Sequence, residues 1–371
     1  MSQILIGLDK IELGGFEVAS IDFARLIQMA QAGDKDNKIR VSPPNKEGAW
    51  YVKIPDNYMF GDLVAGTSKD GYRYWSYVYI SITPTHVCGD NMHNLRKTDY
   101  DEHLEHLLSY LTAKYGISLR AKDIFVRYME INCNIPLKET YRKYTRVIKL
   151  LMSFCGKHLR QEVTYRNLGQ PDAGATTYMR YNGSWAIVVY NKSLQMAQKY
   201  PDRCSNRQDV DAQRDLMRIE IRLHTARKIK NIFRSNRWSQ ITDQAVCTYY
   251  HRVITKPWTT QYKMWIRQKD KELEELLQFF KSEKGRDWYH EIMHYAYDRA
   301  ENDGIPYILD NQQLQEAYRG LPDTHRNSCR VCDKLWDVGD PRDLYHRNDR
   351  DKVAEILSKI SASQSDAEIK E

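Results

Sequence analysis

The stretch that decides the fold reads TTYMRYNGSWAIVVYNK at residues 176–192 and LMRIEIRL at residues 216–223. Its first part holds two runs of β-branched and aromatic residues on either side of Asn182-Gly183, a dipeptide typical of tight β-hairpin turns. Its last part alternates apolar and charged residues, as a strand with one buried face does. We therefore expect a hairpin, a helical connection and a strand that returns to the same sheet.

Charged side chains share one face of the returning strand. Arg218, Glu220 and Arg222 point to one side, and Met217 and the apolar residues that alternate with them point to the core. Contact with solvent is the ordinary reason for such a face. An earlier stretch of the same character, IFVRYMEINCN at residues 124–134, places Glu130 near its middle. With a tyrosine at the end of a third strand, two such acids are the groups that a metal-dependent tyrosine transesterase requires.

These blocks, in this order, resemble the rolling-circle replication initiators of filamentous phages and related plasmids, the gene II/X type. The matching blocks are RYMEI at 127–131, the hairpin that ends in YNK at 190–192, and RIEIRL at 218–223. A further segment, CGDNMHNL at 88–95, stands where that family often has a glycine-His-Asn segment before a helix. The resemblance covers roughly residues 80–235.

The resemblance implies a nickase that acts at a replication origin. Such an enzyme attacks one DNA strand with a tyrosine, keeps a 5′-phosphotyrosyl link, leaves a free 3′-OH for a polymerase and later rejoins the displaced strand. Its partners are origin DNA, both single-stranded and duplex, with a host helicase and polymerase. Two alternatives remain open. One is a conjugative relaxase with the same chemistry, and the other is a non-catalytic, sheet-based DNA-binding regulator.

The order of the predicted elements indicates an α+β protein with one mainly antiparallel sheet and helices on a single face. In the family that the sequence resembles, this sheet has five strands and carries the catalytic groups, and the other face is left free for DNA. We expect residues 1–95 to be an N-terminal β-rich part of the nuclease region and residues 96–235 its catalytic core. Residues 236–371 are expected to form a mostly helical region that binds DNA or a partner, with a frayed tail from residue 361.

Tyr190 is the expected nucleophile. A phenolate is a good leaving group when a later hydroxyl attacks, so the cut strand can be rejoined. Because the unperturbed pKa of tyrosine is about 10, a nearby cation must favour the phenolate. Lys192 shares a face with Tyr190 if the strand continues that far, and this argument fails if the chain turns helical after Asn191. Tyr178 and Tyr181 are the next candidates for the nucleophile.

Glu130 and Glu220 are the expected metal ligands. Carboxylates favour Mg or Mn over zinc, and the ion would polarise the scissile phosphate. The sequence contains no His-hydrophobe-His triplet, which many rolling-circle nucleases use, so a third ligand must come from elsewhere, with His93 or Asp90 as candidates. The alternative without a metal is that the two acids only form ion pairs with the neighbouring arginines.

Basic residues are concentrated after the third strand. The chain has a net charge of +7, and residues 224–238 contain Arg227, Lys228, Lys230, Arg234 and Arg237 without any acid. Such a run suits sequence-independent contact with DNA phosphates, although a solvated helix face would look the same. Arg218 and Arg222 are expected either to clamp phosphate or to pair with Glu130 and Glu220.

Composition and cysteine content indicate the cellular compartment that we expect for the protein. The sequence has no run of about eighteen apolar residues and no basic, then apolar, N-terminal leader, so we expect neither a membrane span nor a secretory signal. Seven widely spread cysteines favour a reducing cytoplasm, and the resemblance implies that of a bacterial host. His325, Cys329 and Cys332 have spacing that zinc accepts, but one Cys-x-x-Cys pair alone does not define a zinc site.

Overall fold

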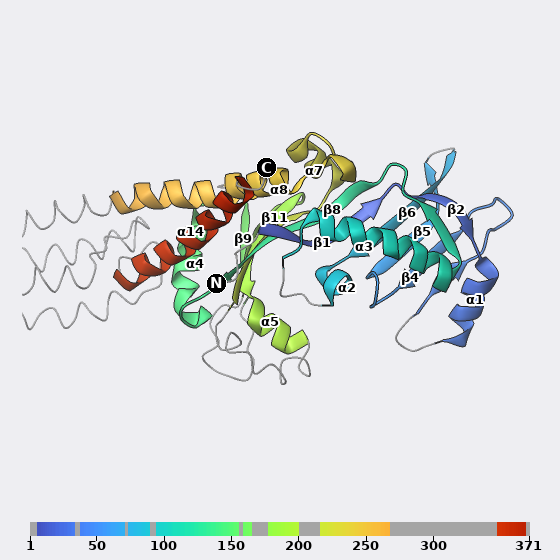
Figure 1. The fold of residues 1–371 in the computed structure, drawn as a ribbon, viewed down its shortest axis with the longest axis horizontal. Helices are drawn as coiled ribbons and strands as arrows, with labels where there is room; N and C mark the ends of the chain where they lie inside the picture. The colour runs from blue at the N-terminus through green and yellow to red at the C-terminus, as the bar shows by residue number, and fades with distance from the viewer. Residues whose placement is uncertain are drawn as a thin grey trace, which may run out of the picture.

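The computed structural model describes residues 6–33, 38–70, 73–89, 94–155, 159–164, 177–199, 216–267 and 347–368. Its strands are β1 (Ile6–Gly14), β2 (Glu17–Ile21), β3 (Arg40–Ser42), β4 (Tyr51–Pro55), β5 (Asp62–Asp70), β6 (Arg73–Ile82), β7 (Ile117–Arg120), β8 (Phe125–Pro136), β9 (Arg160–Thr164), β10 (Thr177–Tyr181), β11 (Trp185–Asn191) and β12 (Leu216–Leu223). Ten of them form one antiparallel sheet in the order β3-β4-β5-β6-β1-β8-β12-β11-β10-β9, and β2 pairs with β7 (Figure 1). The described residues therefore have the predicted α+β fold with a mainly antiparallel sheet.

The stretch that decides the fold forms the strands β10, β11 and β12. The side-chain oxygen of Asn182 accepts hydrogen bonds from the backbone N–H groups of Ser184 and Trp185 at 2.8 and 3.1 Å, and this closes the hairpin between β10 and β11. β12 then returns to pair with β11 on one side and with β8 on the other. The predicted hairpin and returning strand are confirmed.

The strand β1 lies between β6 and β8 and joins the two halves of the sheet. Near its start Ile6 is opposite Cys133 of β8, and near its end Gly14 is opposite both Phe125 of β8 and Tyr79 of β6. Its register against β8 shifts between Leu8 and Ile11, and such an irregularity re-aims the side chains within it. The sheet is therefore continuous from the N-terminal strands into those expected to carry the catalytic groups.

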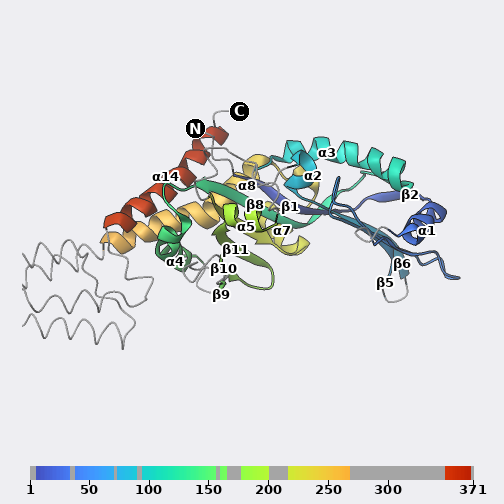
Figure 2. The same ribbon diagram turned by 90° about the horizontal axis from the view of Figure 1, so that it is seen from below.

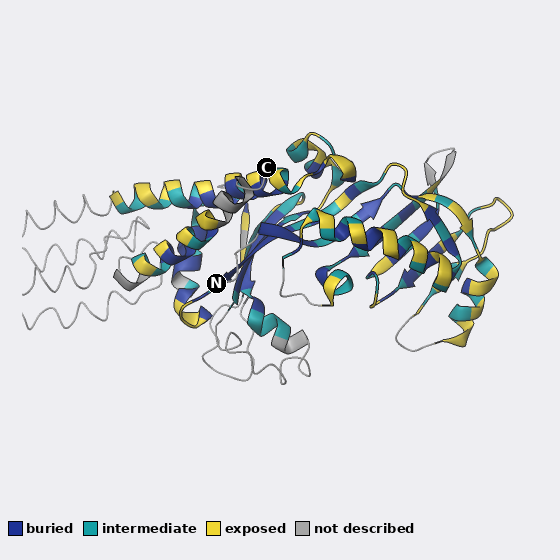
Figure 3. Ribbon diagram, in the orientation of Figure 1, coloured by how far each residue is buried: buried dark blue, intermediate teal, exposed yellow. Residues whose placement is uncertain are grey.

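Helices pack against the sheet. They are α1 (Phe23–Ala32), α2 (Pro84–Cys88), α3 (Lys97–Tyr110), α4 (Thr145–Ser153), α5 (Lys192–Lys199), α7 (Ala226–Phe233), α8 (Asp243–Tyr250) and α14 (Arg347–Glu368), with the short turns η1 (Leu111–Tyr115), η2 (Tyr141–Tyr144), η4 (Trp238–Gln240) and η5 (His251–Thr255). One apolar core takes residues from six of them: Leu26, Leu107, Leu151, Ile229, Val246 and Ile356. The strands at the centre of the sheet are buried beneath these helices (Figure 3).

Two details differ from the predictions, and one prediction is not tested by the described residues. The sheet has ten strands and not five, because the N-terminal strands extend it beyond β1 and β9 extends the hairpin. Residues 361–368, expected to be a frayed tail, continue the helix α14, whose Val353, Ile356 and Ile360 are buried in the core. The expected helices between residues 268 and 346 lie outside the described residues. Among the helices that are described, none has the length and hydropathy of a membrane-spanning segment.

Candidate active site

Polar side chains from neighbouring strands meet on the face of the sheet opposite the apolar core. The register sets Tyr190 of β11 opposite Arg218 of β12, and Arg222 of β12 opposite Glu130 of β8. Residues that face each other across paired strands lie on the same side of the sheet. The alternation visible in the sequence therefore gathers the predicted site residues of three strands into one cluster.

Three acids form the centre of this cluster. Asp9, Glu130 and Glu220 each offer one carboxylate oxygen, and the three oxygens lie within 4.8 Å of one another. Asp9 comes from the irregular part of β1, between Leu8 and Ile11, and sequence reasoning did not find it. It is the third acid that the two predicted ligands lacked. Asp90 and His93, the third ligands considered from the sequence, lie outside the described residues.

Arg218 lies within the cluster and is fully buried, at 0% exposure. Its Nη1 atom is 2.5 Å from Oδ2 of Asp9, and its Nε atom donates to Oδ1 of Asn134 at 2.6 Å. Oε1 of Glu220 is 4.0 Å from the same Nη1 atom. Arg218 was expected either to clamp phosphate or to pair with Glu130 and Glu220, and in the structure its side chain pairs with Asp9 and lies 4.0 Å from Glu220. The charged face of β12 is therefore closed at its centre, because its charges pair with one another.

Arg222 forms the more accessible edge of the cluster, with 31% of its side chain exposed. Its Nε and Nη2 atoms donate to Oε2 of Glu220 at 3.0 and 2.7 Å. Its Nε atom is also 3.4 Å from Oε1 of Glu130, whose side chain is 13% exposed. A phosphate that approaches the cluster from solvent would meet this edge first.

The hydroxyl of Tyr190 donates a hydrogen bond to Oε1 of Glu220. The tyrosine is only 5% exposed and packs beside Ala186 and Val188 on the same face. Burial, followed by the charge of Glu220, raises the pKa of Tyr190 well above its usual value. The phenol is therefore protonated in this arrangement, and a reaction at its oxygen needs a base, for which Glu220 is in hydrogen-bonding contact.

Lys192 lies beside Tyr190, although not for the predicted reason. The strand β11 ends at Asn191 and the helix α5 begins at Lys192, so the argument from a shared strand face fails. The Lys192 side chain is nevertheless buried, and its Nζ atom is 5.9 Å from the centre of the Tyr190 ring. Its Nζ atom also donates to Oε1 of Gln195 at 3.0 Å, one turn further along α5. The helix start, and not the strand, brings the ammonium group to the tyrosine.

A second tyrosine reaches the acids from the solvent side. The hydroxyl of Tyr128 donates to Oε1 of Glu130, two residues along β8. Its ring stacks on His224 at 5.9 Å, with 4° between the planes, and the Nζ atom of Lys10 is 5.2 Å from the ring centre. Because Tyr128 and Glu130 are two residues apart on β8, alternation along the strand puts both side chains on the same face, but the sequence analysis did not single out this tyrosine.

The ionisation of the acids fits a cation site. Burial, and next the charge of Glu220, raises the pKa of Glu130 to about 7, and burial raises that of Asp9 against the effect of Arg218. Burial also opposes ionisation of Glu220, but the charges of Arg222 and Arg218 outweigh it and hold the pKa of Glu220 below its usual value. Three carboxylates that repel one another at this spacing are suitable ligands for Mg²⁺ or Mn²⁺, which prefer oxygen donors.

The basic residues that were predicted to contact DNA after β12 lie on the next helix. Arg227, Lys228 and Lys230 are on α7, where Arg227 and Lys230 are exposed and Ile229 enters the core. The Nζ atom of Lys228 is 5.1 Å from the ring centre of Trp185, which is at the opposite end of β11 from Tyr190. His325, Cys329 and Cys332 lie outside the described residues.

Comparison with known proteins gives a distant likeness. The chain matches no protein-family model and no curated protein. It is similar to the solved structure of a rolling circle replication initiator protein from Geobacillus stearothermophilus, with 13% sequence identity over 61% of this chain and 77% of that chain, and a TM-score of 0.28. A likeness this low establishes no shared activity.

Proposed function

We propose that this protein nicks one strand of DNA by transesterification, with Tyr190 as the nucleophile, and acts as a rolling-circle replication initiator. The observation that carries the proposal is the hydrogen bond from the Tyr190 hydroxyl to Glu220, one of three clustered carboxylates. A nucleophile in contact with a base, beside cations that can receive a phosphate, is the arrangement that covalent phosphoryl transfer needs.

In the nicking step, the Tyr190 oxygen forms a bond to phosphorus and the bond between phosphorus and the 3′ oxygen breaks. Glu220 takes the phenolic proton, and the 3′ oxygen takes a proton from solvent and leaves as a free 3′-OH. Arg222, at the accessible edge, and Lys192, beside the Tyr190 ring, balance the negative charge of the phosphate. Rejoining reverses the step when a 3′-OH attacks the phosphotyrosine.

Asp9, Glu130 and Glu220 would hold a divalent cation, Mg²⁺ or Mn²⁺. Such an ion, when bound, neutralises charge on the phosphate and on the leaving oxygen. The free 3′-OH would serve as a primer for a host polymerase in the bacterial cytoplasm. The region after Thr225, which includes residues 236–371, would contribute origin recognition or contact with a host helicase.

A nicking assay tests the proposal. Supercoiled and single-stranded DNA that carries the origin of the protein's own genetic element is incubated with the wild-type protein and with Tyr190→Phe, in Mg²⁺, Mn²⁺ or EDTA. We expect a metal-dependent nick by the wild-type protein and none by the variant. The two proteins should bind DNA with the same affinity. A nick that survives Tyr190→Phe would assign the nucleophile to another residue.

Two alternatives use the same cluster differently. A conjugative relaxase would perform the same reaction at a transfer origin, and the cognate DNA separates it from a replication initiator. A non-catalytic DNA-binding regulator is favoured by the burial of Tyr190 and by the ion pairs that already neutralise Asp9 and Glu220. Binding without any cleavage of origin DNA, in any of the metals, would favour the regulator.

A further inference from the structure

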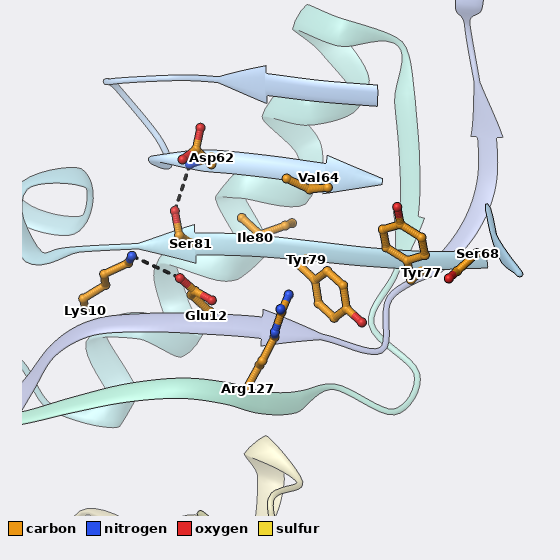
Figure 4. A pocket seen from close by; sticks show the side chains of 10 residues that line it. All are labelled: Lys10, Glu12, Asp62, Val64, Ser68, Tyr77, Tyr79, Ile80, Ser81 and Arg127. Carbon is orange, nitrogen blue, oxygen red and sulfur yellow. Dashed lines mark hydrogen bonds and ion pairs between the residues drawn. The ribbon is translucent and has the colours of Figure 1, made fainter. Parts of the chain in front are cut away.

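Beyond the acidic cluster, the polar side of the sheet continues over β1, β6, β5 and β4. A pocket of about 450 Å³ opens on this side, and it is lined by Lys10, Glu12, Asp62, Val64, Ser68, Tyr77, Tyr79, Ile80, Ser81 and Arg127 (Figure 4). The helices α1, α2 and α3 lie on the opposite side of these strands (Figure 2). The pocket therefore belongs to a face on which none of the described helices packs.

Two tyrosines form the floor of this pocket. The rings of Tyr77 and Tyr79 are 5.4 Å apart with 28° between their planes, and both are seen nearly face-on in a view onto the sheet (Figure 4). Glycines on the neighbouring strands make room for them. A Cβ atom at Gly14 would come within 2.9 Å of the Tyr79 ring, and one at Gly66 within 3.2 Å of the Tyr77 hydroxyl. The rings thus lie across the sheet and do not stand out from it.

One cation lies over one of these rings, and three others share the face, two of them in ion pairs with Glu12 and Asp62. The guanidinium of Arg127 is 4.4 Å from the centre of the Tyr79 ring. The pairing of β3 with β4, and of β4 with β5, also places Arg40 and Lys53 in the same cross-strand row as Tyr79. The described face thus has the cations Lys10, Arg40, Lys53 and Arg127 against the acids Glu12 and Asp62. Flat aromatic rings next to an excess of positive charge suit stacked bases and their phosphates.

This aromatic and basic face adjoins the acidic cluster. Glu12 of β1 is opposite Tyr128 of β8, and Lys10 of the pocket lies over the Tyr128 ring. The Tyr128 hydroxyl in turn contacts Glu130 of the cluster. A chain of direct contacts therefore leads from the pocket to the three carboxylates.

We propose that the face formed by Tyr77, Tyr79, Arg127 and Lys10 binds unpaired nucleotides of the DNA strand that enters the acidic cluster. Bases in a duplex are stacked on each other, so the tyrosines and Arg127 can receive bases only from a single strand. The proposal deepens the function given above and rests on it for the identity of the strand. It assigns the surface that holds the bases of the single strand next to the nick.

Binding of a fluorescent oligothymidine of about 12 nucleotides, measured by anisotropy, tests this subsite. Tyr77→Ala and Tyr79→Ala are each expected to weaken binding about tenfold, whereas Tyr77→Phe and Tyr79→Phe keep the ring and bind like the wild type. Tyr58→Ala is the matched control, because Tyr58 is 71% exposed and does not line the pocket. Thermal melts of all variants separate lost contacts from lost folding. Wild-type affinity in a folded Tyr77→Ala/Tyr79→Ala double variant would overturn the proposal.

Cross-linking locates the bound strand without any cleavage. An oligonucleotide that contains 5-iodouracil should cross-link under ultraviolet light to Tyr77 or Tyr79, in the wild type and in Tyr190→Phe alike. If the cross-link forms but origin DNA is never nicked, the subsite stands and the proposed function fails. If origin DNA is nicked but the cross-link maps elsewhere, the function stands and the subsite is wrong.

Discussion

Nη1 of Arg218 lies 2.5 Å from Oδ2 of Asp9, and both side chains are buried on the polar face of the sheet. Because both groups are shielded from water, removing one of them leaves the other as a buried charge without a counter-ion, which costs about 3–5 kcal/mol. We expect Arg218→Met to lower the free energy of unfolding by about this amount in urea denaturation. The double variant Asp9→Asn/Arg218→Met should recover much of the loss. Full stability of Arg218→Met with weaker DNA binding would instead make Arg218 a phosphate ligand and not a structural ion.

Divalent cations should stabilise the protein through the three carboxylates. Titration with Mn²⁺ is expected to raise the melting temperature of the wild type, because a ligand at about 100 times its Kd adds about 2.7 kcal/mol to the stability of the folded state. Asp9→Asn and Glu130→Gln each remove a ligand oxygen and should reduce this effect. Glu105→Gln, at an exposed acid of α3, serves as the control. An equal response to Mn²⁺ in all four proteins would place the cation elsewhere.

The basic residues of α7 should contribute to DNA affinity without affecting cleavage chemistry. Arg227→Ala and Lys230→Ala remove exposed charges, so each is expected to lower the salt dependence of duplex binding by about 0.9 in the slope of log K against log salt. Lys143→Ala is a matched control, since Lys143 is 62% exposed but paired with Glu139. If the salt dependence of binding is unchanged in both α7 variants, this face of the helix contacts solvent and not DNA.

Asp56, just after β4, should stabilise the fold in a pH-dependent way. Its carboxylate accepts hydrogen bonds from the backbone of Tyr58 and Met59 and from the hydroxyls of Tyr110 and Tyr115, at 2.7 to 2.9 Å. Burial alone would raise the pKa of Asp56, but these hydrogen bonds, that of Tyr115 first, lower it to about 2.

Because this folded-state pKa lies below the unfolded value of about 4, the stabilisation of about 2 kcal/mol is complete above pH 4 and disappears as the pH falls to about 2. Asp56→Asn should therefore be less stable at pH 7 and lose less stability between pH 4 and pH 2. The matched variant Asp62→Asn, at a half-exposed acid, should behave like the wild type. Parallel pH profiles for wild type and Asp56→Asn would refute this account.

Local signals in the sequence were sufficient for the strands around the site. The Asn182-Gly183 turn and the alternation of β12 depend on neighbouring residues, so both were predicted correctly. The position of Asp9 depends on the pairing of β1 with β8, more than a hundred residues away, and no local pattern shows such a contact. Alternation also cannot distinguish a solvated face from a buried one, because Arg218 and Glu220 give the same pattern whether they meet water or each other.

How Lys192 comes to lie beside Tyr190 also could not be predicted from the sequence. Whether β11 continues past Asn191 depends on one boundary residue, and helix and strand ends are the least certain part of any sequence-based prediction. The structure starts α5 at Lys192, yet the Nζ atom of this lysine is 5.9 Å from the centre of the Tyr190 ring.

Identification of the residue that becomes covalently attached to DNA tests the central claim most directly. The wild-type protein is reacted with origin DNA and Mn²⁺, the DNA is digested with nuclease, and tryptic peptides are sequenced by mass spectrometry. The account predicts a nucleotide on Tyr190, in the peptide of residues 181–192, which also contains Tyr181 as an internal comparison. A nucleotide on Tyr128 or Tyr181 with Tyr190 unmodified, or nicked DNA without any covalent adduct, would contradict it.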